Sequence, residues 1–245
     1  EKQMIFKDNG AGLTKEEIHQ FLSVIGQSSK QDLENGELLD DYIGRFGIGL
    51  LSCFMVSDSI IVHTKPMDGS QAYIWTGNLD GTYTLEAFEK AQIGTSISLT
   101  AKSGYESYFS IDKIINLVHY YGLTLPVPIY LEGKTEALNQ MPADFSYSNR
   151  GQLLTFGEWL FKEEFLEAIP IETPHLSGAA YILPYQTDVS IKKGHRIYLK
   201  HMLLTEQGTP LLPNWAFFLR CFLNTRNLRP TASRENFYEN EELEL

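Results

Sequence analysis

The segment most informative about the fold begins at residue 8, where the sequence reads DNGAG (8–12), and a second glycine-rich stretch, GRFGIG, follows at 44–49. Asp-Asn-Gly alone is an ordinary turn sequence, because Asp and Asn bond their own backbone and Gly accepts a positive φ. Placed between small residues, the Asp8 carboxylate can also accept a hydrogen bond from an exocyclic amine while the backbone lies against a flat ring. DNGAG therefore fits a plain turn or one side of a ligand pocket.

The second stretch has glycines at 44, 47 and 49, in the order G-x-x-G-x-G. This order is the reverse of the dinucleotide fingerprint, and the Lys-Ser/Thr of a P-loop is missing, so neither of those nucleotide folds is indicated. The glycines end a polar loop and begin an apolar segment, where backbone N–H groups at a helix N-terminus can bind an anion. The alternative is that small residues only allow this segment to pack closely.

Periodicity predicts the elements around these motifs. TKEEIHQFLSVI (14–25) predicts a helix with a Thr14–Glu17 capping box, FGIGLLSCFMVSD (46–58) predicts a second helix, and the polar residues 26–42 predict a long exposed loop. Runs rich in β-branched and aromatic residues then predict an antiparallel meander, at 59–64, 72–77, 82–88 and 95–101. Ser110 is the expected N-cap of a helix over 111–122 that Gly122 ends.

The polar segment between about residues 133 and 150 predicts a domain boundary, which gives domains at 1–133 and 134–245. A strand at 127–131 closes the first domain. The second is expected to be α/β, with a helix at 157–169, strands at 179–185 and 195–204, and an apolar element at 214–225.

Composition narrows the function classes. The chain has 245 residues, a formal net charge of −11 and no dense Lys/Arg block, which argues against a nucleic-acid or anionic-lipid surface. Cys53 and Cys221 lie in separate apolar runs, so we expect buried, reduced thiols. The sequence has no apolar run long enough to span a bilayer and no secretory leader, so we expect a cytoplasmic protein. We also expect residues of the same domain before Glu1.

The order of these motifs along the chain resembles that of the Bergerat ATP-binding fold, which gyrase, MutL, histidine kinases and the ninety-kilodalton heat-shock chaperones share. The order is Asp-x-Gly-x-Gly, a helix, a polar loop, G-x-x-G-x-G, three strands and a Gly-Thr strand. Within that superfamily the chain is most similar to the bacterial HtpG-like chaperones, on DNGAGLTKEEI (8–18), IGRFGIGLLSCFMVSD (43–58), GTSISL (94–99) and the segment at 212–236 that contains Ser-Arg-Glu. The resemblance implies an α+β fold: a two-layer Bergerat-type sandwich on a mixed, mostly antiparallel sheet, followed by part of an α/β middle domain.

The resemblance also implies site residues. Asp8 would receive the adenine amine, Gly12 and Leu13 would line the base, and Thr95 would lie beneath it. The phosphates would be wrapped by Gly44, Phe46, Gly47 and Gly49. Residues 26–42 would form a lid, and Arg234 would reach the γ-phosphate as the catalytic cation, unless it is only a surface ion-pair partner of a neighbouring Glu.

Four departures from the family pattern limit what the resemblance implies. The glutamate that activates water and the asparagine that holds Mg²⁺ belong to a helix expected upstream of residue 1, so no metal ligand is named in this chain. The family's lid lysine falls on Gln27, and the glutamine that follows the catalytic arginine falls on Tyr238. The carboxy-terminal dimerisation domain is not in this sequence.

The expected function is that of an ATP-dependent chaperone that hydrolyses ATP, using ATP/ADP and Mg²⁺, to close its lid and dock its domains on client proteins. A homodimer is expected for the full-length protein, with no nucleic-acid or membrane partner. Two alternatives stay open: a MutL-like or gyrase-like ATPase acting on DNA, and a nucleotide-sensing scaffold that does not hydrolyse ATP.

Overall fold

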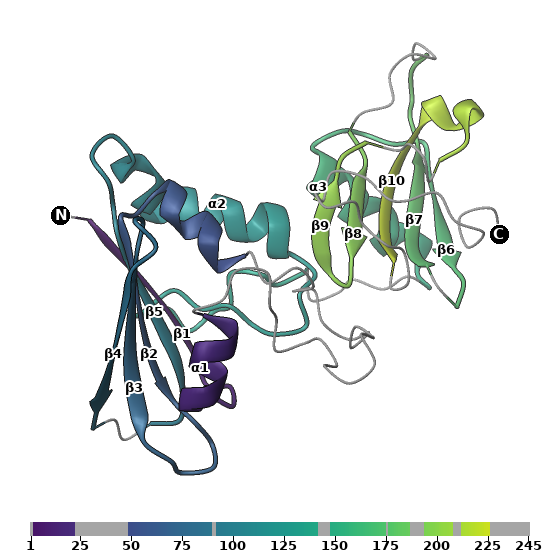
Figure 1. Ribbon diagram of the computed structural model, residues 1–245. Coiled ribbons are helices and arrows are strands. Elements are labelled where there is room, and N and C mark those ends of the chain that lie inside the picture. Colours follow the sequence, from purple (N-terminus) through teal and green to yellow (C-terminus); the bar gives the residue numbers. More distant parts are fainter. Residues whose placement is uncertain are drawn as a thin grey trace. The chain divides into compact units, whose positions relative to one another are not determined.

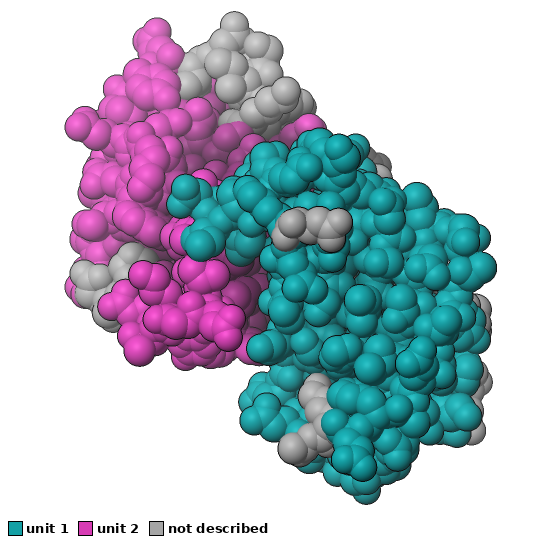
Figure 2. Space-filling view, turned by 90° about the vertical axis from the view of Figure 1, so that its left-hand side faces the viewer, with its two compact units in different colours: residues 1–114 teal, residues 115–245 magenta. Residues whose placement is uncertain are grey.

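The structure is a computed structural model that describes residues 2–22, 49–89, 92–141, 148–174, 176–186, 194–207 and 212–225. The chain forms two compact units, Glu1–Ile114 and Ile115–Leu245, which Figure 2 colours separately. The division falls inside helix α2 (Ile111–Gly122). A domain boundary at residue 133 therefore stays a prediction.

The first unit contains a five-stranded antiparallel sheet in the order β1-β5-β2-β3-β4 (Figure 1). Its strands are β1 (Gln3–Asp8), β2 (Ser59–Lys65), β3 (Ala72–Asn78), β4 (Tyr83–Phe88) and β5 (Gly94–Thr100). The four strands predicted between 59 and 101 are confirmed, but a simple meander is wrong. Since β3 covers only one edge of β2, the other edge pairs with β5, and β1 then pairs with β5.

Short helices cover one face of this sheet. α1 (Lys15–Phe21) begins at Thr14 with the predicted capping box, in which Glu17 N–H donates to the Thr14 hydroxyl and the Glu17 carboxylate accepts from Thr14 N–H. The core beneath joins Ile18 of α1 to Ile60, Val62 and Trp75 of the strands. Residues from η1 (Leu50–Met55) and η2 (Glu106–Phe109) pack against the same core. The two-layer Bergerat-type fold is confirmed.

The helix predicted over 46–58 begins outside the described residues, and within 49–58 it is a short 3₁₀ segment, η1. Its backbone bonds run from i to i+3, as from Ser52 N–H to Gly49 O (3.3 Å) and from Val56 N–H to Cys53 O (3.1 Å). The Ser52 hydroxyl also donates to the Gly49 carbonyl oxygen, at 2.7 Å, so this oxygen accepts two hydrogen bonds from Ser52. A 3₁₀ turn is usually short because its hydrogen bonds are poorly aligned.

The second unit contains a mixed, mostly antiparallel sheet in the order β6-β7-β10-β8-β9. Its strands are β6 (Glu167–Glu172), β7 (Leu176–Ile182), β8 (Arg196–Leu199), β9 (Met202–Thr205) and β10 (Leu219–Thr225), and β10 pairs with β8 in parallel. Every residue of the central strand β10 is buried. One core lies between the sheet and α3 (Arg150–Phe161), and a second involves η3 (Asn214–Phe218) on the other face.

The helix predicted over 157–169 is wrong in position. α3 begins earlier, where the Asn149 side chain accepts from Gln152 N–H at 3.1 Å, and it ends at Phe161, because Lys162 adopts a left-handed conformation with φ 57°. Residues 167–172 then form β6, and Pro170 is tolerated there because β6 is an edge strand.

The strand predicted at 127–131 is also wrong: the structure has only an isolated bridge between Tyr130 and Ala137. The Asn139 side chain takes up the backbone groups that a strand would use. Its oxygen accepts from Ile129 N–H at 2.7 Å, and its amide donates to the carbonyls of Leu125 (3.1 Å) and Val127 (2.9 Å). Such side-chain bonds compete directly with a sheet ladder.

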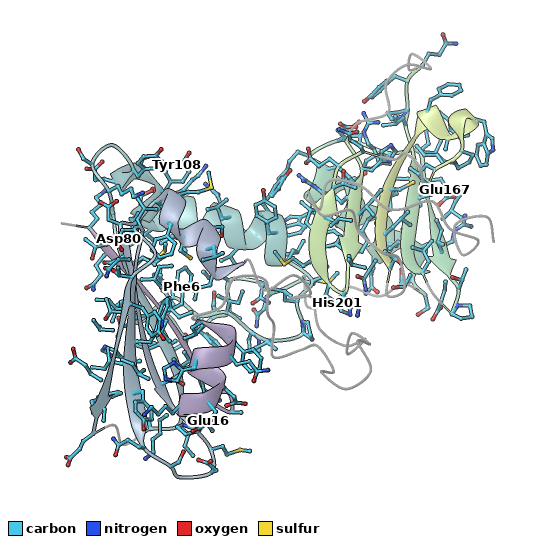
Figure 3. The ribbon with its side chains drawn as sticks, in the orientation of Figure 1. Phe6, Glu16, Asp80, Tyr108, Glu167 and His201 are labelled. Atoms are coloured by element: carbon cyan, nitrogen blue, oxygen red, sulfur yellow. The ribbon has the colours of Figure 1, made fainter. Side chains whose placement is uncertain are left out.

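The apolar run at 195–204 forms a hairpin of β8 and β9 in place of one strand. Lys200 and His201 make its turn with φ values of 48° and 70°, a two-residue turn in which both residues are left-handed. The Asn224 side chain accepts from His201 N–H at 2.8 Å and fixes this turn, at the lower end of the sheet in Figure 3. Side-chain bonding across the sheet thus supports a turn that contains no glycine.

Both cysteines are free, Cys221 being buried and Cys53 half-buried, in agreement with the predicted reduced thiols. Burial raises the pKa of Cys53 and raises that of Cys221 to about 12, so neither thiol has thiolate character near neutral pH. Among the described residues, no helix is long and apolar enough to cross a membrane.

Candidate functional site

The predicted pocket is centred on Asp8, the last residue of β1, and Thr95, which lies directly opposite on β5. One Asp8 carboxylate oxygen, Oδ1, accepts from two backbone groups: Gly10 N–H at 2.9 Å and Thr95 N–H at 3.3 Å. Both bonds go to the same oxygen, and within the described structure no group donates to Oδ2. The side chain is exposed, so the carboxylate has a fixed orientation and one oxygen available to a ligand.

The backbone beside this carboxylate has no room for side chains. Gly94 has φ +116°, and an added Cβ would lie 2.2 Å from the Asp8 carbonyl oxygen. Gly12 has φ +69°, and its Cβ would lie 2.0 Å from the Lys65 carbonyl oxygen. Any L side chain at either position would require the strand ends to separate. These glycines therefore hold the turn after β1 against the ends of β2 and β5.

A buried hydroxyl that the sequence analysis missed, that of Thr64, joins the predicted residues. Leu13 N–H donates to Thr64 Oγ1 at 2.8 Å, and the Thr64 and Thr95 hydroxyl oxygens are 3.2 Å apart. Thr64 is completely buried on β2, on the helix-covered face with Ile60 and Val62. Its sequence signal is a polar residue at an apolar position in the alternating run SIIVHT, since a buried hydroxyl requires a partner.

Asp8, Gly12, Leu13 and Thr95 are thus brought together, as predicted, in the first unit. Gly49 lies on another element of that unit, immediately before η1, and no hydrogen bond among the described residues joins it to these four. Its φ of −59° suits any residue, and no described atom lies within 4 Å of an added Cβ. Neither backbone conformation nor close packing within the described structure therefore requires glycine at 49.

The remaining predicted residues, Gly44, Phe46, Gly47 and Arg234, lie outside the described residues, as do Gln27, Tyr238 and the loop at 26–42. A search of the described residues finds no group of three or more His, Cys, Asp or Glu side chains that could hold a metal ion. The described part of the pocket therefore consists of a carboxylate, two paired hydroxyls and a close-packed glycine backbone.

Comparison with known proteins shows which families the chain resembles. A family model described as histidine kinase-, DNA gyrase B-, and HSP90-like ATPase matches residues 1–104, which contain the whole first sheet. The curated relatives include three proteins named chaperone protein HtpG. That of Orientia tsutsugamushi is 29% identical over 96% of this chain, that of Chlorobium luteolum 28% over 94%, and that of Shouchella clausii 26% over 100%. The chain is similar to these HtpG proteins over nearly its whole length.

The similarity to the HtpG family covers both units, whereas the ATPase model covers only the first. The chain spans about two fifths of the length of these relatives, 41%, 40% and 45% in the same order. Asp8, Gly12, Leu13 and Thr95 all lie within the residues that match the ATPase model.

Proposed function

We propose that this chain is the nucleotide-binding and early middle-domain part of an ATP-dependent chaperone, with adenine bound at Asp8 and Thr95. The observation that carries the proposal is the Asp8 carboxylate, whose Oδ1 accepts from two amides. Its Oδ2 can accept from the exocyclic amine of adenine, whereas guanine has an oxygen at that ring position and would leave two acceptors facing each other. The match of residues 1–104 to an ATPase family model supports ATP as the nucleotide.

The chemistry proposed is hydrolysis of ATP. Water attacks the γ-phosphorus, the bond to the β-phosphate oxygen breaks, and ADP and phosphate leave. This chain would supply adenine binding at Asp8, Leu13 and Thr95, phosphate contacts from residues 44–49, and the Arg234 cation. Mg²⁺ would neutralise phosphate charge, and the residue that activates water is expected upstream of residue 1.

The biological output proposed is conformational. ATP binding would close residues 26–42 as a lid and dock the middle domain, and hydrolysis would reset both. The proposal includes client proteins, a homodimeric full-length form and a cytoplasmic location, and the similarity to HtpG proteins supports it. DNA-stimulated turnover would instead support the MutL-like or gyrase-like alternative, and binding of ATP without turnover would support the non-hydrolysing scaffold.

The test is calorimetric titration of ADP into the full-length protein and its Asp8→Asn variant. Loss of a charge-assisted bond should weaken ADP binding by roughly 10- to 100-fold, corresponding to about 1.5–3 kcal/mol. Asp80→Asn is a matched control, because Asp80 also accepts from a backbone N–H two residues on (Thr82, 2.9 Å) in the β3–β4 turn labelled in Figure 3. Equal ADP affinities for the parent and Asp8→Asn would show that Asp8 does not bind the nucleotide.

A further inference from the structure

The second unit contains a cavity that the proposed ATPase function does not use. It has a volume of about 320 Å³ and is lined by residues from the second half of α2, the end of α3 and β8. Leu123 and Tyr198, which are 2% and 1% exposed, belong to the buried core and form its base. This volume is at the small end of ligand-binding pockets, enough for one or two fused rings.

Two aromatic rings in the lining each carry a cation. The Arg196 guanidinium lies 4.5 Å from the centroid of the Tyr120 ring, and Lys162 Nζ lies 5.3 Å from that of Trp159. Phe156 also stacks on Trp159, with ring centroids 5.9 Å apart. Trp159 is still 40% exposed and can therefore contact a ligand. Such rings lose little freedom on binding, which favours affinity.

The two cations differ in how their charges are compensated. Arg196 forms an ion pair with Glu206, and burial together with this carboxylate raises the pKa of Tyr120, so Arg196, Glu206 and Tyr120 interact as one group. Lys162 has no carboxylate within ion-pair distance in the described structure. The adjacent Glu163 faces the Arg220 guanidinium at 3.6 Å and accepts from the Tyr185 hydroxyl at 3.2 Å. Lys162 is therefore the cation available to an anionic ligand.

The backbone supports this role of Lys162. As the residue that ends α3 it has φ 57°, a conformation in which helices usually place glycine, and its N–H donates to Glu158 O at 3.0 Å. This conformation places Lys162 directly after α3, where its side chain lines the cavity. The Lys162 ammonium already lies over the ring against which an aromatic ligand would stack.

We propose that this cavity binds a small planar aromatic monoanion, with its ring against Trp159, Tyr120 and Leu123 and its charge at Lys162. An apolar body displaces water from the aromatic and leucine surfaces, and a single carboxylate or sulfonate meets Lys162, with which no described carboxylate pairs. The described lining residues include two cations, Lys162 and Arg196, and no acidic side chain, so a cationic ligand of the same shape meets like charges there. The proposal is independent of ATP binding, which concerns the first unit.

The test uses three probes with the same ring system: 2-naphthoate, 2-naphthol and 2-naphthylmethylammonium. Each is titrated calorimetrically into the full-length protein with and without saturating ADP. We expect saturable 2-naphthoate binding with a dissociation constant below roughly 1 mM, weaker binding of 2-naphthol, and the weakest binding of the ammonium probe. ADP should change none of these affinities. Equal affinities for the three probes, or no saturable 2-naphthoate binding, would overturn the proposal.

Two variants locate the site. Lys162→Gln removes the charge and should weaken 2-naphthoate roughly three- to tenfold while leaving 2-naphthol unchanged. Trp159→Leu should weaken both probes, because both stack on this ring. Lys134→Gln, at an exposed lysine of the same unit, is the matched control and should have no effect. An unchanged 2-naphthoate affinity in Lys162→Gln with an unchanged melting temperature would contradict the assignment.

Discussion

The hydroxyl oxygens of Thr64 and Thr95 lie 3.2 Å apart on adjacent strands, and the Thr64 oxygen also accepts from Leu13 N–H at 2.8 Å. One buried hydroxyl thus connects β2, β5 and the turn before α1. Because Thr64 is completely buried, it cannot itself contact a nucleotide. We propose that it is a positioning residue, which holds Leu13 and Thr95 in place beside Asp8.

Thr64→Val tests this role by removing the hydroxyl at nearly constant volume. The Leu13 N–H loses its acceptor, which should cost about 1–3 kcal/mol of folding stability, measured by urea unfolding. ADP affinity should also fall at least about threefold, since both partners are freed to move. Thr64→Ser keeps the hydroxyl and should restore most of the affinity. A destabilised Val variant with parental ADP affinity would leave Thr64 with a purely structural role.

Gly12→Ala should displace the turn after β1. Its Cβ would lie 2.0 Å from the Lys65 carbonyl oxygen, in addition to the strain of a positive φ. We expect a loss of more than roughly 3 kcal/mol in the free energy of unfolding and loss of ADP binding. Gly69→Ala is the control, since Gly69 has φ +81° but no described atom within 4 Å of its Cβ, and it should cost only about 1–2 kcal/mol. Similar losses of stability for both variants would mean that the close approach of the Cβ to the Lys65 carbonyl oxygen does not destabilise the Gly12→Ala variant.

Arg234→Ala should separate hydrolysis from binding in the full-length protein. If Arg234 meets the γ-phosphate only after the domains dock, the variant should keep its ADP affinity and lose at least ~10-fold in single-turnover hydrolysis. ATP hydrolysis by Arg234→Ala at the parent rate would indicate that Arg234 only forms a surface ion pair. A joint fall of ADP affinity and turnover, with a lowered melting temperature, would indicate a destabilised second unit.

His195 should make stability depend on pH. Burial, and secondarily the Arg220 charge, lower its pKa from 6.5 to about 4, and its Nδ1 accepts from Cys221 N–H at 3.2 Å. Between these two pH values the unfolded chain binds a proton that the folded protein does not. The contribution of neutral His195 is therefore complete above pH 6.5 and is lost as the pH falls to about 4, by up to roughly 3 kcal/mol.

His195→Asn provides the comparison, because an amide oxygen can accept from Cys221 N–H but does not titrate. The free energy of unfolding of the parent should fall more steeply between pH 7 and 4.5 than that of the variant, with the difference measured relative to pH 7.5. Parallel pH profiles would show that His195 is protonated in the folded protein without cost.

The sequence predicted most of the first unit because its signals are local or strongly periodic. The Thr14–Glu17 capping box acts over three residues, and the β-branched runs between 59 and 101 identify four strands without any tertiary information. The order of the motifs along the chain, through its resemblance to the chaperone family, predicts that the adenine site contains Asp8, Gly12, Leu13 and Thr95. Strand order was not predictable, since β2 pairs with β5 across the intervening β3–β4 hairpin and no local pattern indicates that pairing.

In the second unit, local patterns were overridden by contacts made across the fold. Residues 157–169 are amphipathic enough for one helix, yet the left-handed Lys162 ends α3, and residues 167–172 pair with β7. Residues 127–131 have the composition of a strand, but Asn139 binds their backbone groups. Propensity is a weak preference, and a satisfied hydrogen bond or a paired strand outweighs it.

The sequence by itself determined a turn carboxylate between glycines and a Gly-Thr strand start, because these are properties of residue type and spacing, and the resemblance to HtpG-like chaperones predicts a nucleotide pocket there. Only the tertiary structure placed Thr95 N–H on the Asp8 carboxylate across 87 residues and Thr64 between Leu13 and Thr95. The physical reason is that a hydrogen bond depends on distance and direction in space. Strand pairing sets both for residues that are remote in the chain.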